Sequence, residues 1–164
     1  GALIDKSHHV SLAADALNET VEFAEAVAAA AAMTDPKDTL IIVTADHSHG
    51  LTLNGGKRDT PILGVLQGTD DDPPVALDDR PVPILMYATG PGAPGRGEPR
   101  SVPTEADMAD PDRLTYAAIP LPSAAHTGED VAAYARGLGA SQIRGLMDQP
   151  GVHRAMRQAL GLGK

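Results

Sequence analysis

The stretch TLIIVTADHSHG, Thr39 to Gly50, decides how the rest of the sequence is interpreted. Its first half is a run of apolar, mostly β-branched residues, which favours a strand that is apolar on both faces, as in a parallel sheet. The run ends in Asp46 and His47, and a second histidine follows at His49. Ligands of α/β proteins bind at the carboxyl ends of sheet strands. These side chains are therefore either ligands of a bound group or polar residues of an ordinary loop.

The composition limits which kinds of protein and site are possible. The chain has 164 residues and 42% apolar residues, enough for a domain with a real core, but only 2% aromatic residues. The formal net charge of −9 argues against a nucleic-acid partner or an anionic membrane surface. No apolar run reaches the roughly 18 residues of a membrane span. Because there is no cysteine, any metal ion must be held by histidine, aspartate or glutamate.

A long helix is predicted before the strand. Apolar residues recur at helical spacing over residues 10–33, and alanine dominates the second half of that segment. Pro36 disfavours helix in the residue before it, so the helix ends in the TDPKD segment. A helix, a tight loop and an apolar strand make half of a βαβ unit, and the predicted fold class is therefore α/β.

The C-terminal segment contains one ambiguous stretch and one clear helix. In residues 125–140, Thr127 and Asp130 fit a capping box, which favours a helix. The alternation over residues 131–136 equally allows a strand, so both structures stay open at this point. Residues 150–160 predict a short helix with basic residues in its C-terminal half.

Proline and glycine crowd the middle of the chain, where two islands, residues 61–68 and 81–90, look extended. We interpret residues 54–123 as an insertion of crown-like loops and short strands. It carries substrate selectivity or subunit contacts, or is only variable decoration. The chain then divides into an α/β core segment (1–53), this insertion (54–123) and a return to the core with the C-terminal helix (124–164).

Residues suited to binding metal gather in three segments. The members are Asp5, His8 and His9; Asp46, His47 and His49; and His126. Asp5 and His9 are four residues apart, so a helical turn places both on one face. Zinc accepts imidazole and carboxylate ligands, and three protein ligands leave a fourth position open for chemistry. Each segment alone is more typical of loop or capping residues, and the case for a site rests on their combination.

Three motifs in order give the sequence a resemblance to a known family. They are IDKSHH (4–9), VTADHSHGLTLNGG (43–56) and AHTGEDVAAYARG (125–137), and the ending GVHRAMRQALGL (151–162) adds to them. Together they resemble alkaline phosphatases, over essentially the whole chain and most loosely over residues 57–113. The match is to the C-terminal third of that family's catalytic domain. It implies part of a large, mostly parallel sheet flanked by helices.

The resemblance also implies an activity and metal ligands. The family hydrolyses phosphate monoesters through a phosphoserine intermediate, with two zinc ions and one magnesium ion. Carried over by motif, the implied ligands are Asp5, His9 and His126 for the first zinc, and Asp46 and His47 for the second. His8 and His49 are implied to orient ligands or water. Lys6 stands where some bacterial members place a lysine that contacts phosphate through water, although Lys6 together with His8 mixes the patterns of different branches.

Several parts of the family's machinery match nothing in this sequence. No serine fits the nucleophile's motif, so no residue here is assigned as the nucleophile, and the magnesium ligands have no counterpart. We therefore expect the chain to be inactive alone and to be covered by the remainder of the phosphatase or a second subunit, in a homo-oligomer. The resemblance implies a periplasmic or secreted location.

Two other functions remain as alternatives. One is a non-catalytic metal-binding or assembly module. The other is a hydrolase of the same superfamily that acts on phosphodiesters, phosphonates or sulfate esters, since aspartate–histidine metal pairs recur there. The combination of ADHSHG (45–50) with HTGEDVA (126–132) favours the phosphatase.

Overall fold

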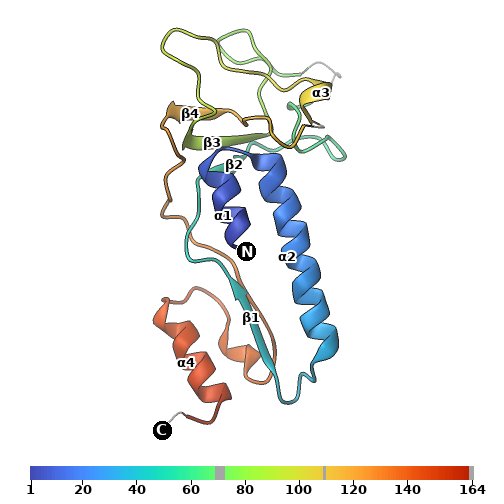
Figure 1. Cartoon of the computed structure of the whole chain (residues 1–164), viewed down its shortest axis with the longest axis vertical. Helices are drawn as coiled ribbons and strands as arrows, with labels where there is room; N and C mark the ends of the chain where they lie inside the picture. The colour runs from blue at the N-terminus through green and yellow to red at the C-terminus, as the bar shows by residue number, and fades with distance from the viewer. Residues whose placement is uncertain (69–72, 109, 163–164) are drawn as a thin grey trace. The chain divides into compact units, whose positions relative to one another are not determined.

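The computed structural model describes residues 1–68, 73–108 and 110–162. They form an α/β structure with mixed sheets, in two compact units. The first unit is made of Gly1–Phe23 and Ser48–Gly128, and the second of Ala24–His47 and Glu129–Lys164. Figure 1 shows the order of the elements along the chain. The three segments expected from composition stay a prediction about the intact protein.

Helix α1 (Ala2–His9) and the first part of α2 (Ala13–Met33) belong to the first unit. The sequence predicted a helix from residue 10, but the chain turns there because Ser11 takes a left-handed conformation, with φ 59°. The buried Ser7 links the two helices: its Oγ lies 2.8 Å from the Leu3 carbonyl oxygen and 2.5 Å from Asp15 Oδ2. The turn is therefore fixed, and with it the end of α1.

The sheet of the first unit has three strands, β2 (Leu51–Leu53), β3 (Leu85–Gly90) and β4 (Ala117–Pro120). Strand β3 lies in the centre, antiparallel to β2 and parallel to β4. The core of the unit surrounds Tyr87 of β3, which is fully buried against Ala13, Leu85 and Ala117. Tyr87 is the largest of the fully buried side chains in the part of the chain that the structure describes.

The described residues of the proline- and glycine-rich segment form a strand, a short helix and β-bridges. Its second extended island contains β3, whereas in the first island only Val65 forms a β-bridge, with Pro83. A short helix, α3 (Glu105–Met108), follows. Arg100 organises a loop through a two-pronged ion pair with Asp78, at 2.6 and 2.9 Å. The short strand predicted in the second island is therefore present, and a paired charge and a bridge hold nearby parts of the segment.

The second unit is built on a two-stranded sheet of β1 (Leu40–Thr44) and β5 (Ala133–Gly137). The pairing is antiparallel and β1 is mostly half-buried, which corrects the expectation of a parallel strand buried on both faces. The ambiguous stretch resolves as strand β5, so its helical alternative was wrong. A 3-10 turn, η1 (Ala140–Gln142), and helix α4 (Pro150–Ala159) follow, and α4 confirms the predicted terminal helix. A large parallel sheet is not formed by the described residues.

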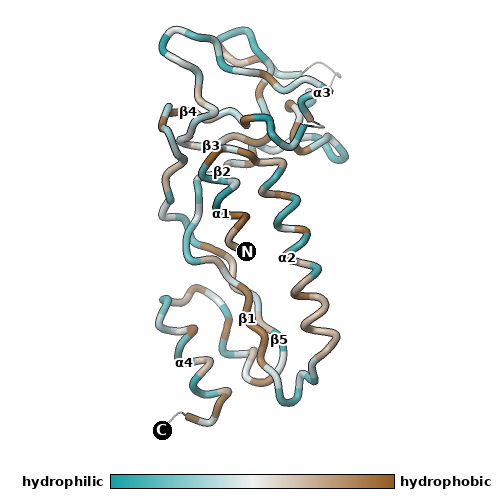
Figure 2. The backbone as a smooth tube through the Cα atoms, viewed as in Figure 1, coloured by the Kyte–Doolittle hydropathy of each residue, from teal (hydrophilic) through white to brown (hydrophobic). Residues whose placement is uncertain are grey.

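Apolar side chains remain exposed on the second unit. Figure 2 shows hydrophobic residues along β1. Tyr134 of β5 is 67% exposed and Leu146 is 88% exposed. Among the described residues no helix is both long and apolar enough to cross a membrane.

Candidate metal centre

Four side chains from three segments of the first unit meet in one place. Asp5 and His9 come from α1, one helical turn apart, as the spacing predicted. His49 precedes β2, and His126 follows β4. One ligand atom from each of the four lies within 4.8 Å of all the others. This is a group that could hold a metal ion.

Backbone contacts fix the three segments to one another. The Thr127 amide donates to the Ser48 carbonyl at 2.8 Å, in a β-bridge that joins the loops carrying His126 and His49. The Ala124 amide donates to the carbonyl of His9 at 2.8 Å and so ties the third segment to α1. Gly50 has φ 60° and lies so close to its neighbours that a Cβ there would be 3.1 Å from Thr127 Cγ2. A side chain there would strain the backbone and press on Thr127, so glycine is favoured where the loop passes the site.

The distances within the group suit zinc. His9 Nε2 lies 3.2 Å from His126 Nε2, and Asp5 Oδ1 lies 3.6 Å from the former and 3.9 Å from the latter. In a tetrahedral zinc site with bonds of about 2.0–2.1 Å, neighbouring ligand atoms are about 3.3 Å apart. One ion would therefore reach all three atoms after shifts of a few tenths of an ångström.

Hydrogen bonds determine which nitrogen of His9 is available. Its Nδ1 lies 2.9 Å from the Ala124 carbonyl oxygen and 3.0 Å from Ser123 Oγ. A carbonyl only accepts, so Nδ1 carries the proton and donates it, and Nε2 of the neutral ring keeps a bare lone pair. That lone pair faces His126 Nε2. This arrangement, with the outer nitrogen donating to a backbone carbonyl, is the usual support of a metal-binding histidine.

His49 plays a different part from the other three residues. Its Nε2 lies 2.7 Å from Asp5 Oδ1 and donates a hydrogen bond to that carboxylate. The His49 side chain is only 4% exposed and that of Asp5 is 41% exposed, so water reaches the contact only from the Asp5 side. A nitrogen that donates to the carboxylate has no lone pair for a metal ion, so His49 orients Asp5 and leaves three ligand atoms facing the centre.

His8 lies between His49 and Tyr87. The two rings stack with centroids 5.3 Å apart, and His8 Nδ1 lies 2.8 Å from the Tyr87 hydroxyl. Burial, with a smaller contribution from the nearby His49, lowers the pKa of His8 to about 4. Burial also lowers the pKa of His49, although the hydrogen bond that His49 donates to Asp5 acts in the opposite direction. Both rings are therefore neutral at physiological pH, and Asp5 supplies the negative charge of the group.

The remaining residues singled out in the sequence lie outside this group. Asp46 and His47 belong to the second unit, just after β1. They contact each other, with His47 Nε2 3.6 Å from Asp46 Oδ2, and the Asp46 side chain is 84% exposed. Lys6 lies on the exposed side of α1. The structure thus brings together the residues of the first implied zinc site.

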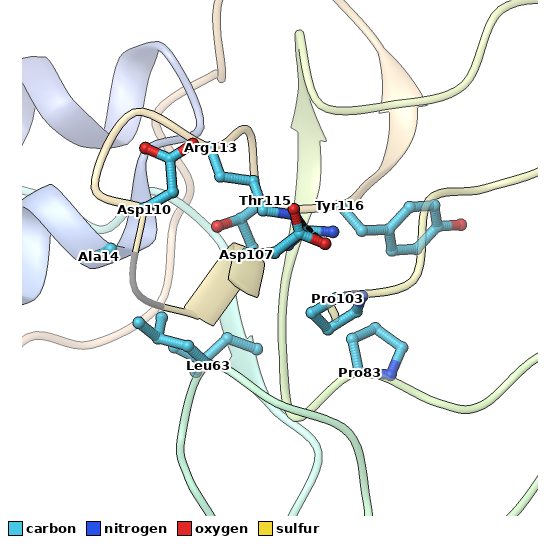
Figure 3. Close-up of a pocket in the computed structure, with 10 residues that line it drawn as sticks. Ala14, Leu63, Pro83, Pro103, Asp107, Asp110, Arg113, Thr115 and Tyr116 are labelled. Carbon is cyan, nitrogen blue, oxygen red and sulfur yellow. Dashed lines mark ion pairs between the residues drawn. The ribbon is translucent and has the colours of Figure 1, made fainter. Parts of the chain in front are cut away.

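A separate surface pocket of the first unit contains none of these residues. It is lined by α3 and nearby loops, with Leu63, Pro83 and Pro103 on its apolar side (Figure 3). Arg113 and Asp107 form an ion pair across its polar side, at 3.4 Å. Two of its charged groups are thus engaged with each other, and the pocket contains no histidine.

Sequence reasoning missed one residue of this region. Tyr87, which contacts His8, was interpreted only as part of an extended island. One signal was available, because the chain has only three tyrosines and Tyr87 stands inside an apolar run. A buried phenol needs a hydrogen-bond partner, and a histidine-rich site supplies one.

The fold and the group together define an α/β protein with a site of imidazole and carboxylate ligands. Comparison with known proteins is more specific, since a sequence model described as alkaline phosphatase matches residues 1–162. The chain belongs to the alkaline phosphatase family.

Individual relatives agree with this family. The tissue-nonspecific isozyme of alkaline phosphatase from Gallus gallus is 38% identical over 99% of this chain. Alkaline phosphatase 4 of Drosophila melanogaster is 37% identical over 99%, and an alkaline phosphatase of Gadus morhua is 35% identical over 100%. The chain covers 31%, 29% and 34% of these three proteins, so it spans about a third of their length.

Proposed function

We propose that the intact protein hydrolyses phosphate monoesters through a phosphoserine intermediate, and that this chain supplies its first zinc site and part of the second. Membership of the alkaline phosphatase family supports the reaction class. The observation that carries the assignment to this chain is the group of Asp5, His9 and His126, whose ligand atoms have the spacing of a zinc site.

Each residue of the group has a defined task in this proposal. Asp5, His9 and His126 hold the first zinc, with His9 kept in the correct tautomer by the Ala124 carbonyl. His49 holds the carboxylate of Asp5 and so limits its rotation. Zinc bound there would supply Lewis acidity toward water and phosphate oxygens. The fourth coordination position of such a zinc would be open to a phosphate oxygen or a water molecule.

The second site and the nucleophile need residues from elsewhere in the intact protein. Asp46 and His47 are proposed as two ligands of the second zinc. No serine of this chain matches the family's nucleophile, and no residue matches its magnesium ligands. Lys6, exposed on α1, is proposed to contact phosphate through water. On this basis the chain alone is inactive.

The same proposal extends to the fold and the setting of the protein. The exposed apolar residues of the second unit suit strands and helices that are covered in a larger, mostly parallel sheet. Residues 1–53 and 124–164 would then belong to that core and residues 54–123 to an insertion. A homo-oligomer and a periplasmic or secreted location complete the proposal.

Replacement of His126 tests the assignment. In the intact protein, His126→Ala should lose one tightly bound zinc and most hydrolysis of an aryl phosphate, measured by metal analysis and by release of the phenol. His153→Ala, at an exposed histidine of α4, is the matched control and should keep both. Unchanged zinc content in His126→Ala would contradict the ligand assignment.

Substrate choice separates the alternatives. A related hydrolase would prefer an aryl phosphodiester or sulfate over the monoester. A metal-binding assembly module would bind zinc and turn over none of the three. Competition assays with matched aryl esters therefore decide between the classes.

A further inference from the structure

Tyr87 links the core of the first unit to the histidine group. Its ring is fully buried at the centre of the core. Its strand is held from both sides, because Tyr87 pairs with Leu51 of β2 and with Ala117 of β4. The phenol is therefore carried by one of the best-fixed positions of the unit, while its hydroxyl points out of the core toward α1.

The hydroxyl of Tyr87 determines the state of the His8 ring. Of the described residues, the one hydrogen-bond partner of this hydroxyl is His8 Nδ1, at 2.8 Å. A buried O–H that fails to donate is costly, so the phenol donates and Nδ1 is the acceptor. The proton of the neutral His8 ring is then on Nε2. The rings meet edge to face, with centroids 5.7 Å apart, which further limits rotation of His8.

His8 transmits this constraint to His49. Their rings are stacked, with an angle of 27° between the planes. His49 in turn donates to Asp5 at 2.7 Å. The main chain supports the same contact, since the Ala88 amide donates to the Gly50 carbonyl at 3.0 Å, directly after His49. Tyr87 thus reaches the ring of His49 through His8, and its strand holds the backbone of Gly50, the residue after His49.

We infer that Tyr87 is a positioning residue of the metal centre, which acts through His8 and His49 to set the orientation of Asp5. The inference rests on the proposed function, because it assumes that Asp5 binds the metal. The plain alternative is that Tyr87 only fills the core. The two differ in what the hydroxyl does, because the aromatic ring alone is enough for packing.

Tyr87→Phe in the intact protein separates these roles, since it keeps the ring and removes only the hydroxyl. The matched control is Tyr116→Phe, the same change on the segment next to β3, where the ring contacts Arg100. The first measurement is nitrogen NMR of histidine-labelled, metal-free protein. In Tyr87→Phe we expect the His8 signals to move from a single tautomer to a mixture, with a smaller change at His49. Tyr116→Phe should leave both unchanged.

The second measurement is zinc affinity by competition with a chelator. Loss of an outer partner of a metal ligand costs about 10–100-fold, and Tyr87→Phe should fall toward the lower end of that range because it acts through two rings. Cobalt substituted for zinc should show an altered visible spectrum, which a change in packing far from the ligands would not produce.

The outcomes separate the inference from the proposed function. A wild-type protein that binds no zinc contradicts the proposed function and the inference with it. A wild-type protein that binds zinc, with His8 signals and zinc affinity unchanged in Tyr87→Phe, overturns the inference alone. Unchanged His8 signals with weakened zinc binding also overturn it, since the effect would then not pass through His8.

Discussion

His47 and His49 stand two residues apart in the sequence, yet they belong to different compact units. His49 is buried and hydrogen-bonded to Asp5, a residue 44 positions earlier in the chain. His47 contacts its neighbour Asp46, whose side chain is 84% exposed. The difference teaches that two histidines of one motif can have different surroundings, since the His47 side chain is 23% exposed and that of His49 is 4% exposed. What organises His49 is that three segments of one unit are tied together around it.

The two surroundings explain this contrast. His49 leads into β2, which pairs with the central strand β3, and its loop is bridged to the segment of His126. His47 follows β1, whose partner among the described strands is β5, in a sheet of two strands. Two strands alone supply little burial, because a sheet needs further strands or a packed helix for stability.

The largest expected effect on zinc binding comes from replacing a proposed zinc ligand of the first unit. In the intact protein, His9→Ala should weaken zinc binding at the first site by more than the roughly 100-fold that loss of an outer partner can cost. It removes the bare nitrogen that faces His126. Chelator titration measures the affinity. His47→Ala is the control from the other region and should leave the first zinc bound. Equal losses of the first zinc in both variants would show that the two regions form one site.

A smaller effect is expected at His49. His49→Ala removes the donor to Asp5, so zinc affinity should fall by about 10–100-fold while the bound stoichiometry is kept at saturating metal. His49→Gln retains an amide N–H in nearly the same place and should recover part of the loss. If His49→Ala instead lowers the stoichiometry at saturation, His49 is itself a ligand and the assigned donor role is wrong.

The sequence predicted the members of the site better than their arrangement. The spacing of Asp5 and His9 predicted a shared helix face, because that distance depends only on local helix geometry. The contact of His126 with them depends on the hydrogen bond from Ala124 to His9 and on the bridge at Thr127, which join residues more than 70 positions apart. No local pattern encodes such pairings, so they came from the resemblance.

For the fold as well, local sequence patterns predicted single elements but not the contacts between residues far apart in the chain. Helix α4 and the body of α2 follow from periodicity and from Pro36. The antiparallel pairing of β1 was not predictable. An apolar sequence pattern predicts a buried strand but does not distinguish a parallel from an antiparallel partner. Tyr87 was missed for a related reason, since its hydroxyl meets His8 across 79 residues of sequence.

A third prediction compares one kind of hydrogen bond in the two units. Ser7 Oγ and Thr34 Oγ1 each lie 2.8 Å from the carbonyl four residues earlier. Ser7 is buried and also contacts Asp15, whereas the bond of Thr34 is exposed. Ser7→Ala should lower the free energy of unfolding by about 1 kcal/mol, the usual net value of a hydrogen bond. Thr34→Ala should change it by less than about 0.5 kcal/mol.

Denaturant unfolding of the two variants measures both values in the intact protein. A Thr34→Ala cost as large as that of Ser7→Ala would show that the second unit is as well organised as the first. The comparison between the regions would then hold only for their histidines.

The smallest expected effect is on the pH dependence of stability, at Asp107 on the exposed edge of the first unit. The amide and hydroxyl of Thr104 donate to Asp107, both at 2.8 Å, and hold the pKa of that carboxyl below its ordinary value of 3.8. A depressed pKa means that the native state binds the proton less readily than the unfolded state. The stabilisation is therefore present above about pH 3.8 and is lost as the pH falls through the native pKa. Asp107→Asn should lower stability slightly at neutral pH, and the difference in stability from wild type should disappear in acid, as followed by thermal unfolding from pH 6 to about pH 3.

A stability difference that grows in acid would mean that the Asp107 carboxylate is strained rather than stabilised by its hydrogen bonds with Thr104. The Thr104–Asp107 hydrogen bonds lie at the surface, which keeps the effect small because water screens the charge.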